Sequence, residues 1–442
     1  MSSIVESLSR RSQGDVIFHY RDHVVSVKDF SRVATAIRNY YKDSDSKAVE
    51  LRVVDRDVLP YFLAAFDGYA SRMVILHESF ADEVVLPESM SGHVRTIVSR
   101  KFLDELSYEN VDLSWKPTTS TKWLIPTSGT TGVPKVIEHD FDSLTSKLKA
   151  NAAKGKGVVW GMFYDVTRFA GLQVLLQVIV GGGELVWTDH RTSDKLVEWL
   201  SDKKVNAISA TPSMWRKLIM SENFDRLNLK LITMGGEIAD ASTLDLIANL
   251  FPEAKIRHIY ASTEAGVGFS VIDKRPGFPV EWLSKALPDG TELKIQDGHL
   301  WIRKQKSSQC RQTLGGDSPS SEWMNTEDLV EKKGDRCLFL GRSNGAINVG
   351  GLKVQPSEVE SILLQHSSVK LVIVRGRPSP IVGNLVVADV VLDNSLLIKQ
   401  DPHELRQELV DLCKSKLEAH KVPAILKIVD DIPLTDAGKL KR

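Results

Sequence analysis

The sequence has few cysteines and no excess of charge of either sign. Cys310, Cys337 and Cys413 are the only cysteines among 442 residues, and they form no C-x-x-C pair. Their spacing argues against a zinc site or a disulfide framework and fits a reducing cytoplasm. Lys plus Arg equals Asp plus Glu, at 57 each. The net charge therefore gives no reason to expect nucleic acid or an anionic membrane surface as the main partner.

Long apolar runs are also missing. Residues 1–15 contain no apolar core of the kind that a signal peptide needs. The longest apolar stretch, around Leu172 to Val180, is interrupted by glutamines and is too short to cross a bilayer. We therefore expect no membrane span and a cytoplasmic location. The length predicts two or more domains.

Between residues 158 and 263, short β-rich runs alternate with helical stretches of about ten residues. The expected strands are 158–164, 184–189, 206–211, 230–237 and 255–263, and the expected helices are 169–180, 193–203, 212–220 and 242–251. A weaker pattern of the same kind comes earlier, with strands at 51–54 and 72–76 and a helix at 59–69. Such alternation predicts an α/β fold built from βαβ units around mostly parallel sheets.

After residue 294 the pattern changes. Residues 294–305 and 329–342 each predict a β-hairpin, with turns at Asp297–Gly298 and Gly334–Asp335, and the polar stretch 307–322 between them predicts a mobile surface loop. We therefore expect a small β-rich subdomain at the end of a large N-terminal domain that spans residues 1–341.

Residues 342–442 predict a small, mobile α+β domain of their own. Helices are expected at 356–366 and 401–420, and strands at 369–374, 384–392 and 424–429. On the second helix one face is apolar, because Leu405, Leu409, Leu412, Cys413 and Leu417 recur at helical spacing.

The segment TSGTTGVPK, residues 127–135, follows an apolar run that predicts a strand. Glycines allow backbone N–H groups to converge, hydroxyls donate further hydrogen bonds and a lysine supplies charge, so the segment predicts a phosphate-binding loop. It is not a Walker A loop, because no Gly-Lys-Ser/Thr occurs. The candidate phosphate contacts are Thr127, Ser128, Gly129, Thr130, Thr131, Gly132 and Lys135.

This segment resembles the phosphate-binding motif of the adenylate-forming superfamily, which includes acyl- and aryl-CoA synthetases, nonribosomal peptide adenylation domains and luciferases. Further resembling motifs follow in the family's order: GGE at 235–237, YASTE at 260–264, WMNTEDLV at 323–330, GRSNGAINVGG at 341–351 and PLTDAGK at 433–439. The resemblance extends from about residue 123 to the end. It implies that ATP activates a small carboxylic acid as an acyl-adenylate, with release of pyrophosphate.

The resemblance also implies roles for single residues. The backbone of Gly235, Gly236 and Glu237 would line the adenine, with Tyr260 and Ala261 against its face. Thr263 would contact the α-phosphate, and Glu264 would bind Mg²⁺, since hard cations prefer carboxylate oxygen. Asp328 and Arg342 would hold the ribose.

Lys439 is the implied catalytic residue. It would bridge two anions, the attacking carboxylate and the α-phosphate, and stabilise the charge that builds between them. In the family the C-terminal domain then rotates about a hinge, here Asn344, to admit a thiol. Gly350 and Gly351 would face the pantetheine arm of coenzyme A or of an acyl or peptidyl carrier protein.

Two positions depart from the family pattern, since Ala261 and Glu327 replace glycines and add bulk near the nucleotide. The identity of the acid stays open. Arg168 in the acyl pocket would favour an anionic or polar acid, and Asp165 there would favour an amino group. Alternatively the two pair with each other at the rim.

Other functions also stay open. One is an amino-acid or hydroxy-acid adenylation enzyme that loads a carrier protein. Another is a luciferase-like oxidoreductase, and a third is a non-catalytic nucleotide-binding protein. Because Glu264, Asp328, Arg342 and Lys439 are all present, we favour the acid–thiol ligase.

Overall fold

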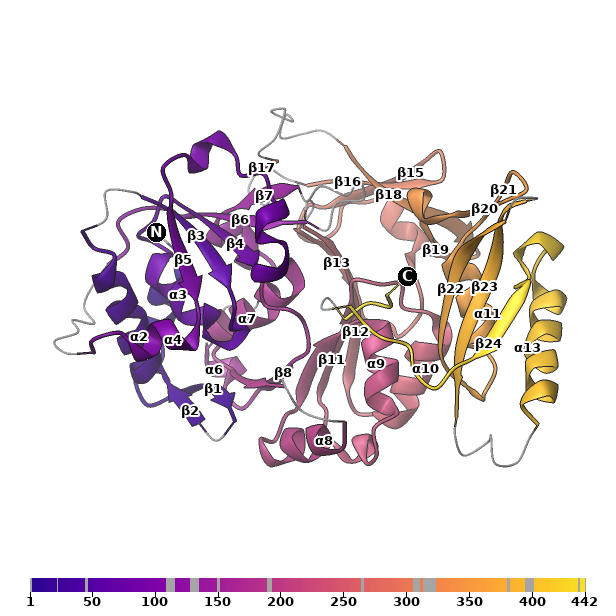
Figure 1. Ribbon diagram of the computed structural model, residues 1–442, viewed down its shortest axis with the longest axis horizontal. Coiled ribbons are helices and arrows are strands. Elements are labelled where there is room, and N and C mark those ends of the chain that lie inside the picture. Colours follow the sequence, from indigo (N-terminus) through magenta and orange to yellow (C-terminus); the bar gives the residue numbers. More distant parts are fainter. Residues whose placement is uncertain are drawn as a thin grey trace.

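The computed structural model describes residues 2–21, 23–43, 47–108, 116–127, 135–148, 152–188, 193–263, 266–304, 311–312, 323–379, 382–393, 401–435 and 438–441. Their strands form four sheets. Two sheets with their helices make up most of the N-terminal part, and the C-terminal sheet lies on the opposite side of the molecule (Figure 1).

The largest sheet confirms the predicted βαβ series. Its strands are β1 (Val16–Tyr20), β2 (His23–Ser26), β8 (Val159–Met162), β9 (Glu184–Trp187), β10 (Ala207–Ala210), β11 (Leu231–Gly235), β12 (Lys255–Ser262) and β13 (Gly266–Val271). They lie in the order β13-β12-β11-β10-β8-β9-β1-β2, and all pairs are parallel except those of the edge strands β13 and β2. The helices of this series are α7 (Phe169–Gly181), α8 (Ser193–Asp202), α9 (Pro212–Ile219) and α10 (Ala241–Leu250).

Local chemistry sets where these helices begin. Thr211 caps α9 by accepting a hydrogen bond from the Met214 amide at 3.1 Å, and Pro212 occupies the first turn. Asp240 caps α10 in the same way through the Thr243 amide. Both caps come directly after strands or their loops, so the helix N-termini face the carboxyl ends of the parallel strands.

A second, mixed sheet carries the strands around the predicted phosphate loop. Its strands are β3 (Ala48–Val53), β4 (Arg72–His77), β5 (Val94–Val98), β6 (Lys122–Pro126), β7 (Val136–His139) and β17 (Arg311–Gln312), in the order β17-β7-β6-β4-β3-β5. The helices of this region are α1 (Ile4–Ser9), α2 (Val27–Tyr40), α3 (Leu59–Phe66), α4 (Arg100–Asp104), α5 (Phe141–Thr145) and α6 (Ala152–Gly155).

The predicted β-rich subdomain is present as a five-stranded antiparallel sheet. Its strands are β14 (Phe278–Pro279), β15 (Glu292–Gln296), β16 (His299–Arg303), β18 (Met324–Lys333) and β19 (Arg336–Arg342). Both predicted hairpins are confirmed, and the Asp297–Gly298 turn has positive φ at both residues, as a tight hairpin requires. The predicted surface loop at 307–322 lies outside the described residues, except for 311–312, which form β17 instead.

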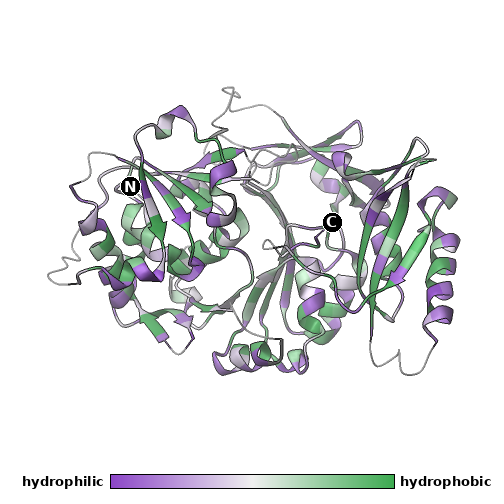
Figure 2. Ribbon diagram, viewed as in Figure 1, coloured by the Kyte–Doolittle hydropathy of each residue, from purple (hydrophilic) through white to green (hydrophobic). Residues whose placement is uncertain are grey.

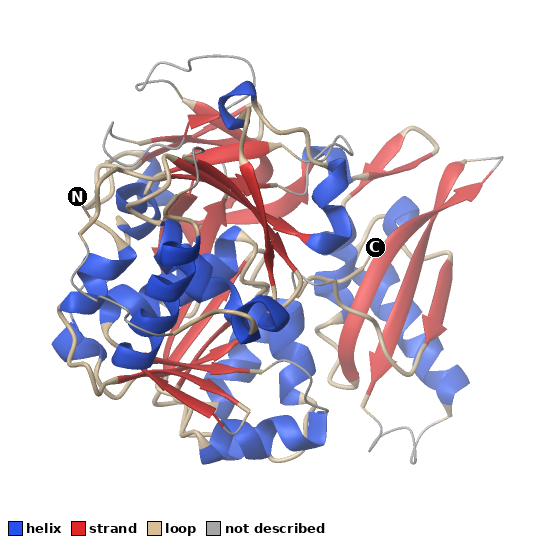
Figure 3. Ribbon diagram, turned by 60° about the vertical axis from the view of Figure 1, so that its left-hand side comes forward, coloured by secondary structure: helices blue, strands red, loops and turns tan. Residues whose placement is uncertain are grey.

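The C-terminal part has its own apolar core between a sheet and two helices (Figures 2 and 3). Its elements are β20 (Ile347–Val349), β21 (Leu352–Val354), α11 (Pro356–Leu363), β22 (Val369–Ser379), β23 (Gly383–Leu392), α13 (Pro402–Lys416) and β24 (Ile425–Ile428). Leu405, Leu409 and Cys413 are buried, as predicted. The prediction that the second helix reaches residue 420 is wrong, because Leu417 is extended and ends it.

Cys337 and Cys413 are both buried free thiols, and Cys310 lies outside the described residues. Among the helices that the structure describes, none is long and apolar enough to cross a membrane.

The N-terminal helix is tied to the core through a buried carboxylate. Asp67 is 1% exposed and accepts hydrogen bonds from the Ile4 amide at 2.8 Å and from the Trp123 indole at 3.0 Å. Burial outweighs these two bonds and raises the pKa of Asp67 from 3.8 to about 7. The folded protein therefore holds a proton that the unfolded chain loses at lower pH.

We predict that Asp67 makes the protein less stable as the pH rises from about 4 to about 7. Below this window both states are protonated, and above it both are ionised, so the loss is complete near pH 7 and amounts to roughly 4 kcal/mol. Chemical unfolding at several pH values should show the slope in the wild type and lose it in Asp67→Asn. The exposed Asp225→Asn is the control and should keep the slope.

Candidate active site

Two predicted site residues lie at the carboxyl ends of the parallel strands, since Gly235 ends β11 and Thr263 follows β12. Thr211, which the sequence did not suggest, follows β10 at the same edge. Open α/β sheets bind ligands outside these strand ends. In Figure 1 the last residues of the chain cross from the C-terminal sheet and end at this edge.

The C-terminal tail is folded back into a tight turn. Leu434 and Leu440 form a β-bridge, and the Thr435 amide donates to the Lys439 carbonyl at 2.7 Å. Two contacts fix the turn to the large domain. The Thr211 hydroxyl donates to the Gly438 carbonyl, and the Leu440 amide donates to Glu237 Oε1 at 3.4 Å. Lys439 is therefore held between two anchored neighbours.

Gly236 lies beneath the Lys439 side chain. Its φ is +81°, and a Cβ at this position would stand 3.4 Å from Lys439 Cε and 3.7 Å from the Thr211 methyl group. A larger residue would be strained in this backbone conformation and would crowd the lysine. Glycine at position 236 thus leaves the space that the lysine stem occupies.

Four charged side chains from distant parts of the chain surround Lys439. Lys439 keeps solvent exposure, yet the protein atoms around it lower its pKa by desolvation. The carboxylates of Glu237 and Asp328 raise this pKa, whereas the cations Arg342 and Arg168 lower it further. The predicted catalytic lysine and the predicted ribose pair are thus brought together, and Arg168 joins them.

Asp328 is held from both sides. The Tyr260 hydroxyl donates to Oδ2, and Arg342 Nε donates to Oδ1 at 3.3 Å. The Tyr260 ring stacks with Phe269 and Phe339, at centroid distances of 5.1 and 5.2 Å. Protein rings therefore already contact Tyr260, and its stacking on adenine stays a prediction. Ala261, beside it, lies at a β-bulge in β12.

His139 is a site residue that the sequence did not suggest. It ends β7, and its Nε2 lies 3.1 Å from the carbonyl oxygen of Thr263. A carbonyl only accepts, so this nitrogen carries the proton. Burial lowers the pKa of His139 to about 4, which keeps the ring neutral at physiological pH. A neutral histidine thus fixes the backbone just before Glu264.

The structure describes only the two ends of the predicted phosphate loop, Thr127 and Lys135. Ser128, Gly129, Thr130, Thr131 and Gly132 lie outside the described residues, as does the predicted Mg²⁺ ligand Glu264. Thr127 and Lys135 flank the loop, and the Thr127 amide donates to the Lys135 carbonyl at 2.7 Å. The loop therefore joins two paired strands, β6 and β7. In the part of the chain that the structure describes, no group of three acidic, His or Cys side chains could hold a metal.

The side chains of the two acyl-pocket candidates have different surroundings, although the Arg168 amide donates to the Asp165 carbonyl at 3.0 Å. Asp165 is 4% exposed, and its carboxylate accepts from the amide and hydroxyl of Thr167 and lies 3.6 Å from Arg56. These partners give Asp165 a role in the turn before α7. Arg168, at the start of α7, is one of the cations near Lys439.

The predicted hinge and thiol-channel residues lie at the start of the C-terminal part. Asn344 is in the short 3-10 helix η7 (Ser343–Gly345), between the β-rich sheet and β20. Gly350 and Gly351 form the β20–β21 turn, which lies away from the C-terminal tail in Figure 1. The structure does not bring this turn to Lys439.

Glu327, which stands where the resemblance predicts a glycine, adopts a backbone conformation that favours glycine. Its φ is +61°, in the left-handed region, and its side chain is exposed. The Glu327 amide donates to Asn325 Oδ1 at 2.8 Å, and Asp328 follows directly. The extra bulk therefore points to solvent, and its cost is backbone strain.

Two protein-family models match this chain. The family model described as AMP-binding enzyme matches residues 34–305, and that of the AMP-binding enzyme C-terminal domain matches residues 358–439.

Three relatives illustrate the likeness. A 2-succinylbenzoate–CoA ligase of Listeria monocytogenes is 24% identical over 81% of this chain and 77% of its own length. The human mitochondrial acyl-coenzyme A synthetase ACSM2B is 27% identical over 72% of this chain and 59% of its own length. The fold is similar to the solved o-succinylbenzoate CoA synthetase of Bacillus subtilis in complex with its acyl-adenylate, with a TM-score of 0.70, 18% identity and coverage of 100% and 97% of the two chains.

We predict that Glu327→Gly stabilises the protein. The change removes a left-handed residue that costs about 1–2 kcal/mol and adds backbone freedom that costs roughly 0.5–1 kcal/mol, so a net gain of up to about 1 kcal/mol is expected. Thermal unfolding provides the measurement. Glu331→Gly, an exposed glutamate on the same strand with ordinary φ, is the control and should lose stability. An equal loss of stability in both variants would contradict the claim that the backbone at Glu327 is strained.

Proposed function

The chain belongs to the AMP-binding enzyme family, and from this we propose that Lys439 and Arg168 stabilise the transition state of an AMP-forming acid–thiol ligase. In the first half-reaction a carboxylate oxygen attacks the α-phosphorus of ATP, the new P–O bond gives the acyl-adenylate, and the bond to pyrophosphate breaks. In the second, the thiol of coenzyme A attacks the acyl carbonyl and AMP leaves.

The observation that carries this proposal is the position of Lys439. A residue near the end of the sequence lies among Glu237, Asp328, Arg342 and Arg168 at the strand ends. Attack by a carboxylate on a phosphate brings two anions together, and fixed cations offset their repulsion. Lys439 and Arg168 come from different domains, so the full set of cations exists only when the tail is docked.

The remaining residues position the nucleotide. Asp328 and Arg342 bind the ribose, and Tyr260 orients the Asp328 carboxylate through its hydroxyl. Thr263, held by His139, contacts the α-phosphate. Glu264 would bind Mg²⁺, which would neutralise charge on the ATP phosphates, while the loop at 127–135 would hold the phosphates themselves. The backbone of Gly235, Gly236 and Glu237 lines the adenine.

Glu237 has a second role as a positioning residue. Oε2 accepts from the Ser213 amide at 3.0 Å, and Oε1 accepts from Leu440, next to the lysine. Its charge also raises the pKa of Lys439. Glu237 therefore holds the lysine in place and favours its protonated form.

The second half-reaction requires the tail to leave. Residues 342–442 act as the mobile domain, Asn344 as its hinge, and Gly350 and Gly351 then face the thiol. The contacts between the two parts suit such a change. Lys217 and Asp431 form an exposed ion pair at 2.9 Å, which contributes at most about 1 kcal/mol.

Coenzyme A is the acceptor that the relatives' names support, and a carrier protein is the alternative. We also propose that the enzyme acts in the cytoplasm, since widely spaced free thiols suit a reducing compartment. Comparing the two acceptors with one adenylated acid decides between them.

We predict that Lys439→Ala abolishes carboxylate-dependent ATP–pyrophosphate exchange, with a loss of about 10²–10³-fold. Transfer from a supplied acyl-adenylate to coenzyme A should persist, because the lysine serves the first half-reaction. Lys441→Ala, an exposed lysine two residues later, is the control. Unchanged exchange in Lys439→Ala would contradict the mechanism, and absence of exchange with every acid would contradict the function.

A second prediction concerns Glu237→Gln. Removing the carboxylate lowers the pKa of Lys439, so the alkaline limb of the exchange rate should move to lower pH, and the rate itself should fall about tenfold. The exposed Glu253→Gln should change neither. A lower rate with an unmoved alkaline limb would show that Glu237 only supports the fold.

A further inference from the structure

Helix α7 begins beside the reaction centre with an arginine. Arg168 is the N-cap residue of this helix, and its charge lowers the pKa of Lys439. A cation at the N-terminal end of a helix is at the unfavourable end of the helix dipole. The helix itself therefore gives no reason for an arginine at this position, and the contacts of the preceding turn decide where Arg168 lies.

That turn is built around the buried carboxylate of Asp165. Its Oδ1 accepts hydrogen bonds from the amide of Thr167 at 2.9 Å and from the hydroxyl of the same residue at 2.8 Å. The Asp165 carbonyl accepts from the Arg168 amide at 3.0 Å. Gly171 packs on the same backbone, because a Cβ at this glycine would stand 2.2 Å from the Asp165 carbonyl oxygen. The position of Arg168 therefore depends on the position of Asp165.

The second carboxylate oxygen of Asp165 faces an arginine from the other large sheet. Arg56 begins the short 3-10 helix η1 (Arg56–Val58), which follows β3, and its Nη2 lies 3.6 Å from Asp165 Oδ2. The same Nη2 lies 3.0 Å from Nε2 of His77, at the end of β4. A guanidinium only donates, so His77 accepts this bond. Arg56 is thus held between β4 and the turn.

The backbone that carries Arg56 has anchors of its own. Arg100, at the start of α4, donates from Nη1 to Asp55 Oδ1 at 2.6 Å and from Nη2 to Asp57 Oδ1. The residues on both sides of Arg56 are therefore fixed independently of the turn that the Arg56 side chain contacts.

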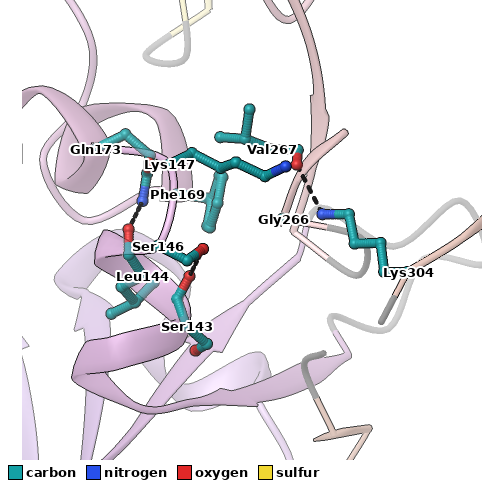
Figure 4. A pocket seen from close by; sticks show the side chains of 9 residues that line it. All are labelled: Ser143, Leu144, Ser146, Lys147, Phe169, Gln173, Gly266, Val267 and Lys304. Atoms are coloured by element: carbon teal, nitrogen blue, oxygen red, sulfur yellow. Dashed lines mark hydrogen bonds between the residues drawn. The ribbon is translucent and has the colours of Figure 1, made fainter. Parts of the chain in front are cut away.

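The body of α7 is also held by separate contacts. Phe169 lies against His139, with ring centroids 5.5 Å apart, and Gln173 donates to the Leu144 carbonyl of α5 at 2.8 Å (Figure 4). None of these residues contributes to the Asp165 turn. A change at Arg56 should therefore move the turn and Arg168, and leave the helix in place.

On the proposed function as a basis, we propose that Arg56 is a positioning residue of the ligase. Through Asp165 it fixes the turn at 165–168 and so places the Arg168 guanidinium at the reaction centre. An uncharged residue at position 56 would leave a buried carboxylate without this cation, which is unfavourable and draws the carboxylate toward water. The turn then loosens, and Arg168 is displaced although its own side chain is unchanged.

Hydrogen exchange tests the positioning without any substrate. In Arg56→Met the amides of Thr167 and Arg168 should exchange at least about tenfold faster than in the wild type, because the turn that holds them opens more often. The corresponding amides at the start of α10 are the internal control, since Asp240 holds them in the same way. Unchanged exchange at Thr167 and Arg168 overturns the proposal.

A double-mutant cycle in ATP–pyrophosphate exchange tests the link to catalysis. Acetate, butanoate, benzoate and succinate are the probes, and the acid with the fastest exchange is used. Arg168→Met should lower kcat/KM by about 10²-fold, and Arg56→Met by about 10–10²-fold through displacement of the same group. The double variant should stay within about threefold of Arg168→Met alone, whereas a residue that only supports the fold gives losses that multiply.

Two further variants separate charge and position from general stability. Arg56→Lys keeps a cation near Asp165 and should stay within about threefold of the wild type, because the ion pair uses a single nitrogen. Arg72→Met is the matched control, since Arg72 also lies in the second sheet and faces a carboxylate of another strand, Glu138, at 3.9 Å. It should change kcat/KM by less than about twofold.

The possible failures are distinguishable. Multiplicative losses in the cycle of Arg56 and Arg168 overturn the positioning role and leave the ligase function intact. Absence of wild-type exchange with every acid contradicts the ligase function, and hydrogen exchange still decides whether Arg56 fixes the turn. Thermal melts identify variants that fail to fold, and Arg56→Gln, which keeps amide donors and loses the charge, then replaces Arg56→Met.

Discussion

The candidate site depends on the contact between the C-terminal tail and the strand ends. The Thr211 hydroxyl caps α9 and also donates to the Gly438 carbonyl, while Glu237 joins the α9 backbone to Leu440. These short polar contacts hold Lys439 above Gly236. Without them the lysine would be a solvated residue near a chain end, since termini are poorly ordered unless tied down. The chemistry therefore rests on a few hydrogen bonds between segments more than two hundred residues apart.

The contact between the tail and the strand ends also determines which charges surround the reaction centre. Docking the tail adds a third cation to Arg168 and Arg342. The carboxylates of Glu237 and Asp328 favour the protonated lysine, against the desolvation by surrounding protein atoms that lowers its pKa. Cations of this kind repel one another, and Glu237 and Asp328 offset only two of the three charges. ATP and the acid bring further anions to the same place. Substrate binding and tail docking therefore stabilise each other.

The sequence predicted the regular parts well and the contacts poorly. The strands and helices from 158 to 263 followed from periodicity, and Lys439, Asp328 and Arg342 followed from motifs. The end of α13 at Lys416 and the three-residue strands β20 and β21 were not predicted. Such short features are fixed by tertiary pairing and leave no periodic pattern in the sequence. His139 and Thr211 were missed because their roles are backbone contacts to residues 124 and 227 positions away. Asp165 stays a predicted pocket residue, and no motif indicated its contacts with Thr167 and Arg56.

Helix α9 also bears on how freely such domains can be exchanged between relatives. One face of it meets the tail through Thr211, and its later turns meet the C-terminal part through Arg216, 3.4 Å from the Lys370 carbonyl, and through Lys217. A recombinant joined at the hinge would pair this helix with a foreign surface. Keeping these contacts in a recombinant would require α9 to be transferred together with the C-terminal part, although the two are far apart in the sequence.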